Sequence, residues 1–90
     1  MPELLHLLIY EYVEDMTNRR APHRDAHLAL IQRYRAEDRL VIAGAIGVPA
    51  HGGLLAFREA SDADAFAAED PYKAAGLITS SRVEPWAVVT

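Results

Sequence analysis

The stretch RDAHLALIQRYRAEDRLVIAGA, residues 24–45, decides the fold because the spacing of its apolar residues changes halfway along. In and just before its first half the side chains of one stripe recur with helical spacing: His23, His27, Leu30, Ile31 and Tyr34. That stripe predicts a helix between Pro22 and Asp38. Residues 40–45, LVIAGA, then form a short apolar run that is typical of a buried strand.

The chain after this stretch repeats the same kinds of element. A second apolar run, GLLAFR at residues 53–58, follows the loop IGVPAHG and predicts a hairpin with the first run. The glycines interpreted as hairpin residues are Gly44, Gly47, Gly52 and Gly53. A second helix is predicted to begin with Ser61 or Asp62 as its N-cap. It should end near Asp70, because Pro71 disfavours helical geometry in the residue before it.

The two ends of the chain supply the outer strands. Leu4–Val13 alternates between two faces, and Leu77–Val89 is extended in character but contains Pro85. Proline lacks a ladder donor, so Pro85 predicts an edge strand or a bulge. The order strand–helix–strand, twice, predicts an α+β, ferredoxin-like βαββαβ fold with a four-stranded antiparallel sheet and two helices on one face. Residues 1–90 are enough for one core, so a single domain is expected.

The first strand has two unequal apolar faces. Leu5, Leu7 and Ile9 form an aliphatic face, which we expect to pack on the helices. The opposite face is aromatic and mixed, and its residues are Leu4, His6, Leu8, Tyr10 and Tyr12. With both helices on one side of the sheet, His6, Tyr10 and Tyr12 would lie on the bare side. An exposed apolar face of this kind favours coverage by a second copy, so we expect a homodimer through the sheet face.

Composition excludes several classes of partner. The chain has a net charge of −4, and its basic residues are scattered apart from Arg19–Arg20, so no basic stripe for nucleic acid exists. It contains no cysteine, which fits a reducing compartment. The apolar run Leu4–Tyr10 is too short for a signal sequence or a bilayer span. A cytoplasmic protein with no membrane partner is expected.

The residues that carry candidate chemistry are His27 and Asp70. His27 lies on the apolar stripe of the first helix, where a leucine would pack equally well, and imidazole is the usual general acid or base near neutral pH. The alternative is a core histidine with satisfied hydrogen bonds. Asp70 stands where the second helix must break, so it either caps the following turn or orients the imidazole. The sequence leaves both alternatives open.

Other candidate sites are weaker. His23 and His27 have the i, i+4 spacing of two metal ligands, but a third ligand such as Asp70 or His51 would be needed, so no metal is expected. Ser80 and Ser81 lack a nucleophile elbow, and no phosphate-binding glycine pattern is present, so no cofactor is expected. Four aromatic residues are candidates for lining a ligand pocket or for the core or an interface: Tyr10, Tyr12, Tyr72 and Trp86.

Two segments resemble the YciI-like (YCII-related) family of the dimeric α+β barrel proteins. In residues 24–45, the match is an Arg three residues before a His-Leu pair, here Arg24, His27 and Leu28. In residues 68–86, AEDPYKAAGLITSSRVEPW, the match is Asp-Pro-Tyr followed by a small residue and glycine, here Asp70, Pro71, Tyr72, Ala75 and Gly76. The chain departs from the pattern at Ala45, where members often have proline, and in a short segment between the middle strands.

The resemblance implies a ferredoxin-like protomer, a dimer, and a pocket in which His27 and Asp70 form a catalytic pair. Relatives in the wider superfamily act on ring or lactone substrates. Our first hypothesis is therefore a lyase- or isomerase-type enzyme without a cofactor, acting on a small-molecule substrate. Arg24 would bind an anionic group, and Tyr72, Tyr10 and Trp86 would complete the binding site. The rival hypothesis is a non-catalytic metabolite-binding or accessory module.

Overall fold

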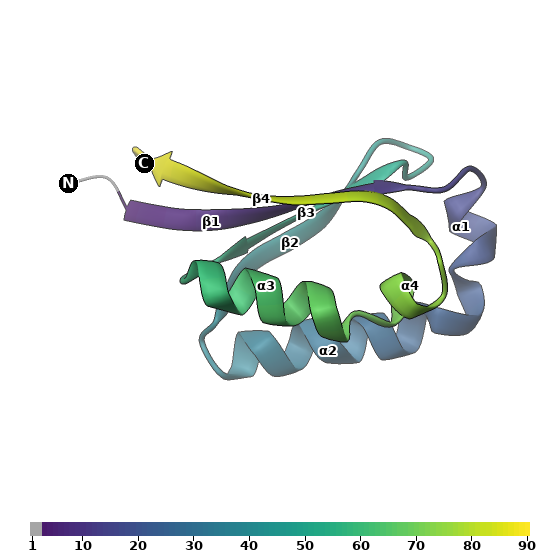
Figure 1. Cartoon of the computed structure of the whole chain (residues 1–90), viewed down its shortest axis with the longest axis horizontal. Helices are drawn as coiled ribbons and strands as arrows, with labels where there is room; N and C mark the ends of the chain where they lie inside the picture. The colour runs from purple at the N-terminus through teal and green to yellow at the C-terminus, as the bar shows by residue number, and fades with distance from the viewer. Residues whose placement is uncertain (1–2) are drawn as a thin grey trace.

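The computed structural model describes residues 3–90 as strands, helices and short connections (Figure 1). The elements in chain order are β1 (Glu3–Tyr12), α1 (Met16–Arg19), a 3-10 turn (Ala21–His23), α2 (Arg24–Ala36), β2 (Leu40–Ile46), β3 (Gly52–Phe57), α3 (Ala60–Glu69), α4 (Pro71–Ala74) and β4 (Ile78–Val88). No helix in this described part is long and apolar enough to cross a membrane.

The four strands form one sheet in the order β2-β3-β1-β4, and every neighbouring pair is antiparallel. The two longer helices, α2 and α3, lie together below the sheet (Figure 1). This arrangement confirms the predicted ferredoxin-like fold. Strand β4 is at the edge, which confirms the prediction from Pro85, whose register partner is His6 of β1.

The faces of β1 are the reverse of those predicted. Leu8 and Tyr10 are 0% and 1% exposed and belong to the core between the sheet and the helices, together with Tyr34, Phe57 and Phe66. Both faces of β1 are apolar, so alternation could not choose between them. The inward side of α3 contains the small residues Ala63 and Ala67, and large rings from the strand fill the space that they leave.

The aliphatic residues of β1 therefore face the side of the sheet that carries no helix. Leu7 and Ile9 lie opposite Ala56 and Leu54 of β3 in the strand register. Leu7, Leu54 and Ala56 line a shallow apolar depression there with Ile42 and Trp86. We call the residues of this depression the outer sheet face.

Several helix boundaries differ from the sequence prediction. Helix α2 begins at Arg24 rather than Pro22, which lies in the 3-10 turn before it. Helix α3 begins at Ala60 with Glu59 as its N-cap, so Ser61 and Asp62 belong to its first turn. Its end at Glu69, one residue before Asp70 and Pro71, is as predicted.

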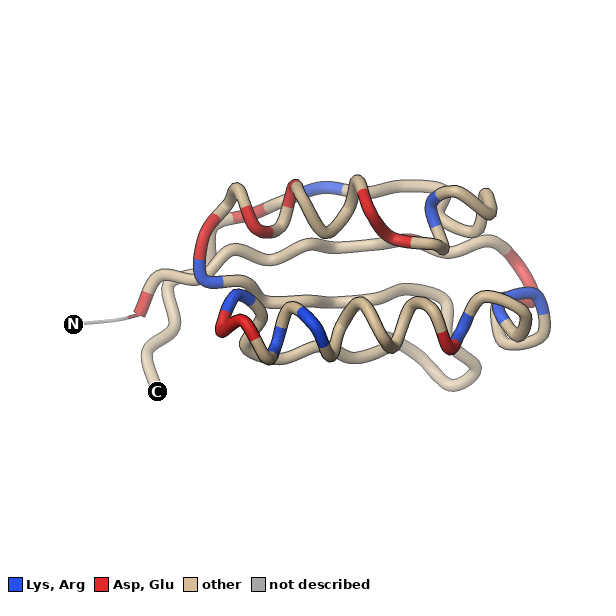
Figure 2. The backbone as a smooth tube through the Cα atoms, turned by 90° about the horizontal axis from the view of Figure 1, so that it is seen from below, with Lys and Arg blue, Asp and Glu red and all other residues tan. Residues whose placement is uncertain are grey.

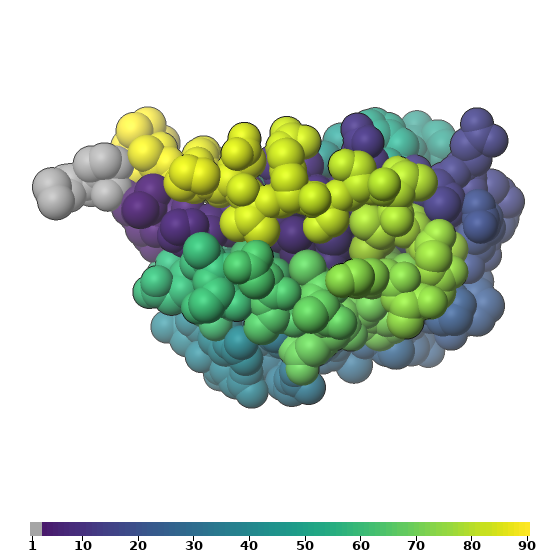
Figure 3. Space-filling view, in the orientation of Figure 1, coloured from purple at the N-terminus to yellow at the C-terminus, as the bar shows by residue number. Residues whose placement is uncertain are grey.

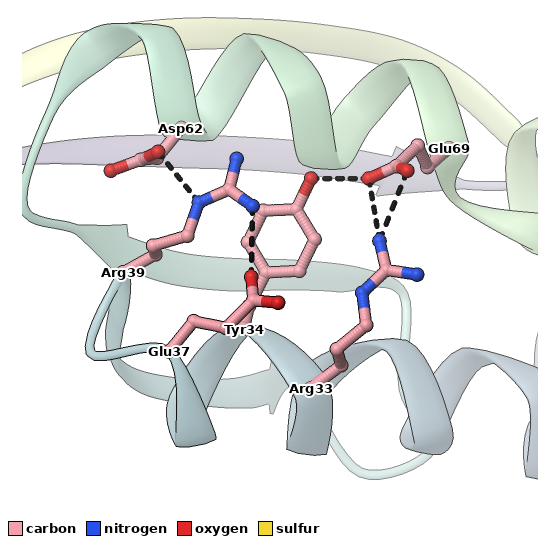
Figure 4. Close-up of polar contacts among 6 residues, drawn as sticks. All are labelled: Arg33, Tyr34, Glu37, Arg39, Asp62 and Glu69. Atoms are coloured by element: carbon pink, nitrogen blue, oxygen red, sulfur yellow. Dashed lines mark hydrogen bonds and ion pairs between the residues drawn. The ribbon is translucent and has the colours of Figure 1, made fainter.

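Polar side chains connect α3 to α2 and to the residues that follow α2 (Figure 4). The Tyr34 hydroxyl donates to Glu69 Oε2, and Arg33 Nη2 donates to both oxygens of the same carboxylate at 3.0 Å. Farther along, Arg39 Nε donates to Asp62 Oδ1 at 2.8 Å and its guanidinium lies 4.1 Å from the centroid of the Tyr34 ring. The contacts at Glu69 fix the last turn of α3 against α2, and the contact at Asp62 holds its first turn.

On the side of the molecule that carries α3, the atoms of α3 and β4 cover most of the surface (Figure 3). In the space-filling view, α3 in green and β4 in yellow meet along this side, with atoms of β1 showing between them (Figure 3). Because α3 packs against the sheet here and ends at Glu69, its position determines the position of Asp70.

The contact at Glu69 predicts a pH-dependent contribution to stability. The pKa of Glu69 is lowered by the hydrogen bond from Tyr34 and then by those from Arg33. Stabilisation from a lowered pKa is complete above the unfolded value, about 4.3, and is lost as pH falls through the folded value. Glu69→Gln should therefore lower the urea midpoint at pH 7 but not at about pH 2, where both proteins lack the charge.

Glu84→Gln is the control for this experiment, because Glu84 is exposed and its ion pair with Arg82 is long, at 3.9 Å. It should leave the midpoint nearly unchanged at both pH values. A Glu69→Gln effect of equal size at neutral and acid pH would contradict the interpretation.

Candidate functional site

Asp70 occupies the break between α3 and α4. Pro71 holds it in an extended conformation, with φ −63° and ψ 121°, so that it caps α4. Its Oδ1 accepts the backbone N–H of Tyr72 at 3.0 Å. The carboxylate is thereby directed into the protein, and Asp70 is only 1% exposed.

The same carboxylate oxygen contacts His27, which is 43 residues earlier in the chain. His27 Nδ1 lies 2.9 Å from Asp70 Oδ1, and His27 is 7% exposed. A carboxylate without a proton only accepts, so the tautomer that fits this contact carries the ring proton on Nδ1 and donates it to Asp70. Asp70 therefore both caps a helix and binds the imidazole, and the two alternatives left open by the sequence occur together.

Two aromatic rings hold the imidazole plane. The Tyr72 ring is stacked on it, with centroids 3.8 Å apart and planes 8° from parallel, and Phe66 meets it edge-on at 6.2 Å. The second ring nitrogen of His27, Nε2, makes no hydrogen bond within residues 3–90 and is not among the fully buried polar atoms there. It is thus the nitrogen available to a ligand.

A pocket of about 310 Å³ lies beside this nitrogen, between the helices and the sheet. Its polar lining consists of His27, Tyr12, Arg20, Arg24 and Tyr72. The apolar lining comes from α2 and the middle strands: Leu28, Ile31, Ala43, Ala45 and Leu55. Ala45, where the family often has proline, therefore forms part of the pocket wall. The volume is at the small end of the range for ligand sites.

The tyrosines around the pair are neutral donors. Burial raises the pKa of Tyr12, and the charge of Asp70 raises it further, while Arg20 and Arg24 act in the opposite direction. The pKa of Tyr72 is also raised by burial, against the same two arginines. Burial and the nearby Asp70 carboxylate likewise raise the pKa of Tyr10. None of the three phenols is expected to ionise near neutral pH.

The structure brings together four of the six residues predicted for the site. His27 and Asp70 are bonded, and Arg24 and Tyr72 line the pocket beside them. Tyr10 lies behind Asp70 in the core and borders a separate, smaller cavity of about 220 Å³ rather than the pocket at His27. Its place follows from the reversed faces of β1.

Trp86 is not brought to His27. It lies on the outer sheet face, 40% exposed, in the register position opposite Leu5. Within residues 3–90, no three His, Asp or Glu side chains are grouped closely enough to hold a metal ion. His51 lies in the hairpin connection, next to the site where Gly47 has a positive φ of 88°.

Sequence reasoning missed two contributors to the site. Arg20 reaches the pocket from the end of α1, and its only signal was its position four residues before Arg24. Gly53 was interpreted as a hairpin glycine but lies inside β3 and has no positive φ. A Cβ at Gly53 would overlap the hydroxyl of Tyr12, so this glycine makes room for a pocket residue.

Fold and site together define a ferredoxin-like α+β protein with a buried His–Asp pair at the edge of a small pocket. The sequence model of the YCII-related domain matches residues 4–87, and the chain belongs to this family. No curated protein matches the chain by sequence.

Solved structures share the fold. A 5-chloro-2-hydroxyhydroquinone dehydrochlorinase from Burkholderia phenoliruptrix superposes with a TM-score of 0.74 at 22% identity, covering 91% of this chain and 92% of that one. A candidate antibiotic biosynthesis monooxygenase from Nitrosomonas europaea gives a TM-score of 0.56 at 12% identity, covering 99% and 93%. At these identities the comparisons establish a common fold.

The close approach at Gly53 yields a test of the pocket wall. Gly53→Ala should lower the free energy of unfolding by about 1–3 kcal/mol, because the added methyl group must displace Tyr12. Gly44→Ala is the matched control in the adjacent strand, since a Cβ there meets nothing within 4 Å. Urea denaturation measures both, and equal effects of the two substitutions would contradict the assignment.

Proposed function

We propose that the protein is a small-molecule enzyme of lyase or isomerase type in which His27 moves a proton. The observation that carries this proposal is the hydrogen bond of 2.9 Å between His27 Nδ1 and Asp70, which leaves Nε2 at the pocket. With Nδ1 protonated, Nε2 has a free lone pair and acts as the general base. Arg24 and Tyr72 bind the substrate.

Asp70 gives the imidazole its orientation and tautomer. A buried carboxylate bonded to Nδ1–H also stabilises the imidazolium that forms when Nε2 accepts a proton. In an isomerisation the imidazolium returns this proton to another atom of the substrate. In an elimination the C–H bond electrons form the new double bond, the leaving group departs with its bonding pair, and the imidazolium passes its proton to that group or to water. The stacked Tyr72 ring limits rotation of the imidazole between these two steps.

The alternative function is a non-catalytic metabolite-binding module. One observation favours it: His27 is 93% buried between two rings, an environment in which a histidine also serves structure alone. In that case the pocket holds a ligand and His27 takes no proton from it. Substitution of His27 separates the two functions.

We expect His27→Gln to lower turnover by about 10²–10⁴-fold, the usual contribution of a general base. The first substrate to test is 5-chloro-2-hydroxyhydroquinone, which the Burkholderia enzyme is named for, with chloride release as the assay. Lactones and other hydroxylated rings follow. A thermal melt and circular dichroism must show that the variant is folded.

A readout that needs no substrate accompanies this assay. Nitrogen-15 NMR of the neutral imidazole should show His27 protonated on Nδ1, and Asp70→Asn should weaken that preference because the charge is removed. Full activity in His27→Gln, or a proton on Nε2 in the wild-type protein, would contradict a catalytic pair.

We further propose that two copies associate through the outer sheet face, as the family resemblance implies. This face exposes large apolar side chains: Ile42 is 60% exposed, Trp86 40% and Leu54 37%. Such a contiguous apolar surface is uncommon on a small monomer. The earlier expectation of a dimer is kept, but its contact residues are these rather than His6, Tyr10 and Tyr12.

Ile42→Glu should weaken self-association about tenfold or more, because it would bury an unpaired carboxylate between the copies. Val48→Glu is the control, since Val48 is equally apolar and fully exposed but lies in the hairpin connection away from the sheet face. Sedimentation velocity at micromolar concentration measures both variants. A wild-type monomer under these conditions would contradict the proposal.

A further inference from the structure

Two chemically different sets of side chains line the pocket beside His27. Two guanidinium groups and two phenols form the polar set, and aliphatic side chains of α2, β2 and β3 form the other. The chain as a whole is acidic, with a net charge of −4, yet no Asp or Glu is among the described residues that line this pocket. The charge of the lining is therefore opposite to that of the chain.

Arg20 and Arg24 are not used to hold the fold. Arg33, Arg39 and Arg58 all form ion pairs with carboxylates at 2.8–3.2 Å. Within residues 3–90, neither Arg20 nor Arg24 has such a partner within 4.0 Å. In the backbone view, basic positions where α1 leads into α2 have acidic positions beside them, and several acidic positions follow α3 (Figure 2).

A second observation concerns the hydroxyl of Tyr72, another polar group of the pocket lining. Tyr72 is 1% exposed and lines the pocket, and its O–H donor has no acceptor in the described chain, although the Arg24 guanidinium is close enough to act on its oxygen and lower its pKa. A buried polar group without a partner costs free energy, so an acceptor supplied by a ligand would stabilise the complex. Both arginines lie close enough to Tyr72 to oppose the rise in its pKa.

We infer that the pocket binds a small organic anion, whose charged oxygens are held by Arg20, Arg24 and the Tyr72 hydroxyl. Its hydrocarbon part lies against Ile31, Ala43 and Ala45. This inference rests on the proposed function for the choice of pocket, and it narrows the substrate class to a carboxylate or an ionised enol or phenol with a compact apolar body. Arg20 becomes a binding residue that sequence reasoning did not identify.

The chemistry of such a ligand suits the position of the base. Tyr72 contributes both the hydroxyl and the ring stacked at 3.8 Å on His27, so a group bound by that hydroxyl lies beside the imidazole. Negative charge that develops on the ligand when Nε2 removes a proton would be stabilised by the two guanidinium groups. The residues that bind the anion are thus also suited to stabilising an anionic intermediate.

Benzoate and benzamide, which share a ring and differ in charge, test this inference by NMR at low ionic strength. Benzoate should give saturable shifts at the amides of Arg20, Arg24 and Tyr72, and benzamide should bind about tenfold more weakly or worse. Arg20→Gln and Arg24→Gln should each weaken benzoate about tenfold. Tyr72→Phe, which keeps the stacked ring, should weaken it several-fold.

Arg19→Gln is the matched control, because it removes the same charge from the neighbouring residue. The Arg19 side chain approaches the carbonyl of Glu14. It should leave benzoate binding unchanged. Absence of saturable shifts, equal binding of benzamide, or equal effects of Arg19→Gln and Arg20→Gln would overturn the inference.

The outcome is independent of the test of catalysis. His27→Gln is expected to keep benzoate binding while losing turnover. If benzoate binds but His27→Gln remains active, the anion site stands and the catalytic role falls. If turnover depends on His27 but benzoate does not bind, the reverse holds.

Discussion

An ionised carboxylate inside a protein is stable only when hydrogen bonds and nearby positive charge replace its lost water. For Asp70 one oxygen accepts both the N–H of Tyr72 and the ring N–H of His27, while the other oxygen is buried without a hydrogen-bond partner in residues 3–90. The first bond starts α4 and the second connects α3 to α2. The path of the chain after α3, the position of the Tyr72 ring and the tautomer of His27 consequently all depend on this single oxygen atom.

The contacts between α2 and α3 support that arrangement from the preceding residue. Glu69 is held by Tyr34 and Arg33, and Asp70 follows it directly, so the last turn of α3 has little freedom to move the carboxylate away from His27. Tyr34 lies on the same stripe of α2 as His27, seven residues farther along. One helix thus presents both the imidazole and the side chain that positions its partner.

Much of the fold was available from local pattern, and less of the site. The periods of residues 24–45 and the break at Asp70–Pro71 gave the elements and their order because they are properties of adjacent residues. The face of β1 that packs on the helices was predicted wrongly, since both faces are apolar and the choice depends on the small side chains of α3 across the core. Arg20 and Gly53 were missed for the same reason: their roles exist only between segments distant in sequence.

Strand β2 borders two cavities, the pocket beside His27 and the depression of the outer sheet face. Ala43 and Ala45 line both the pocket and the depression of the outer sheet face, to which Ile42 and Ile46 also belong, so one strand borders both surfaces. If the pocket binds the proposed anion and a second copy covers the outer sheet face, both binding events place atoms against this one strand. Any coupling that the strand carries between them then changes the two affinities by the same factor.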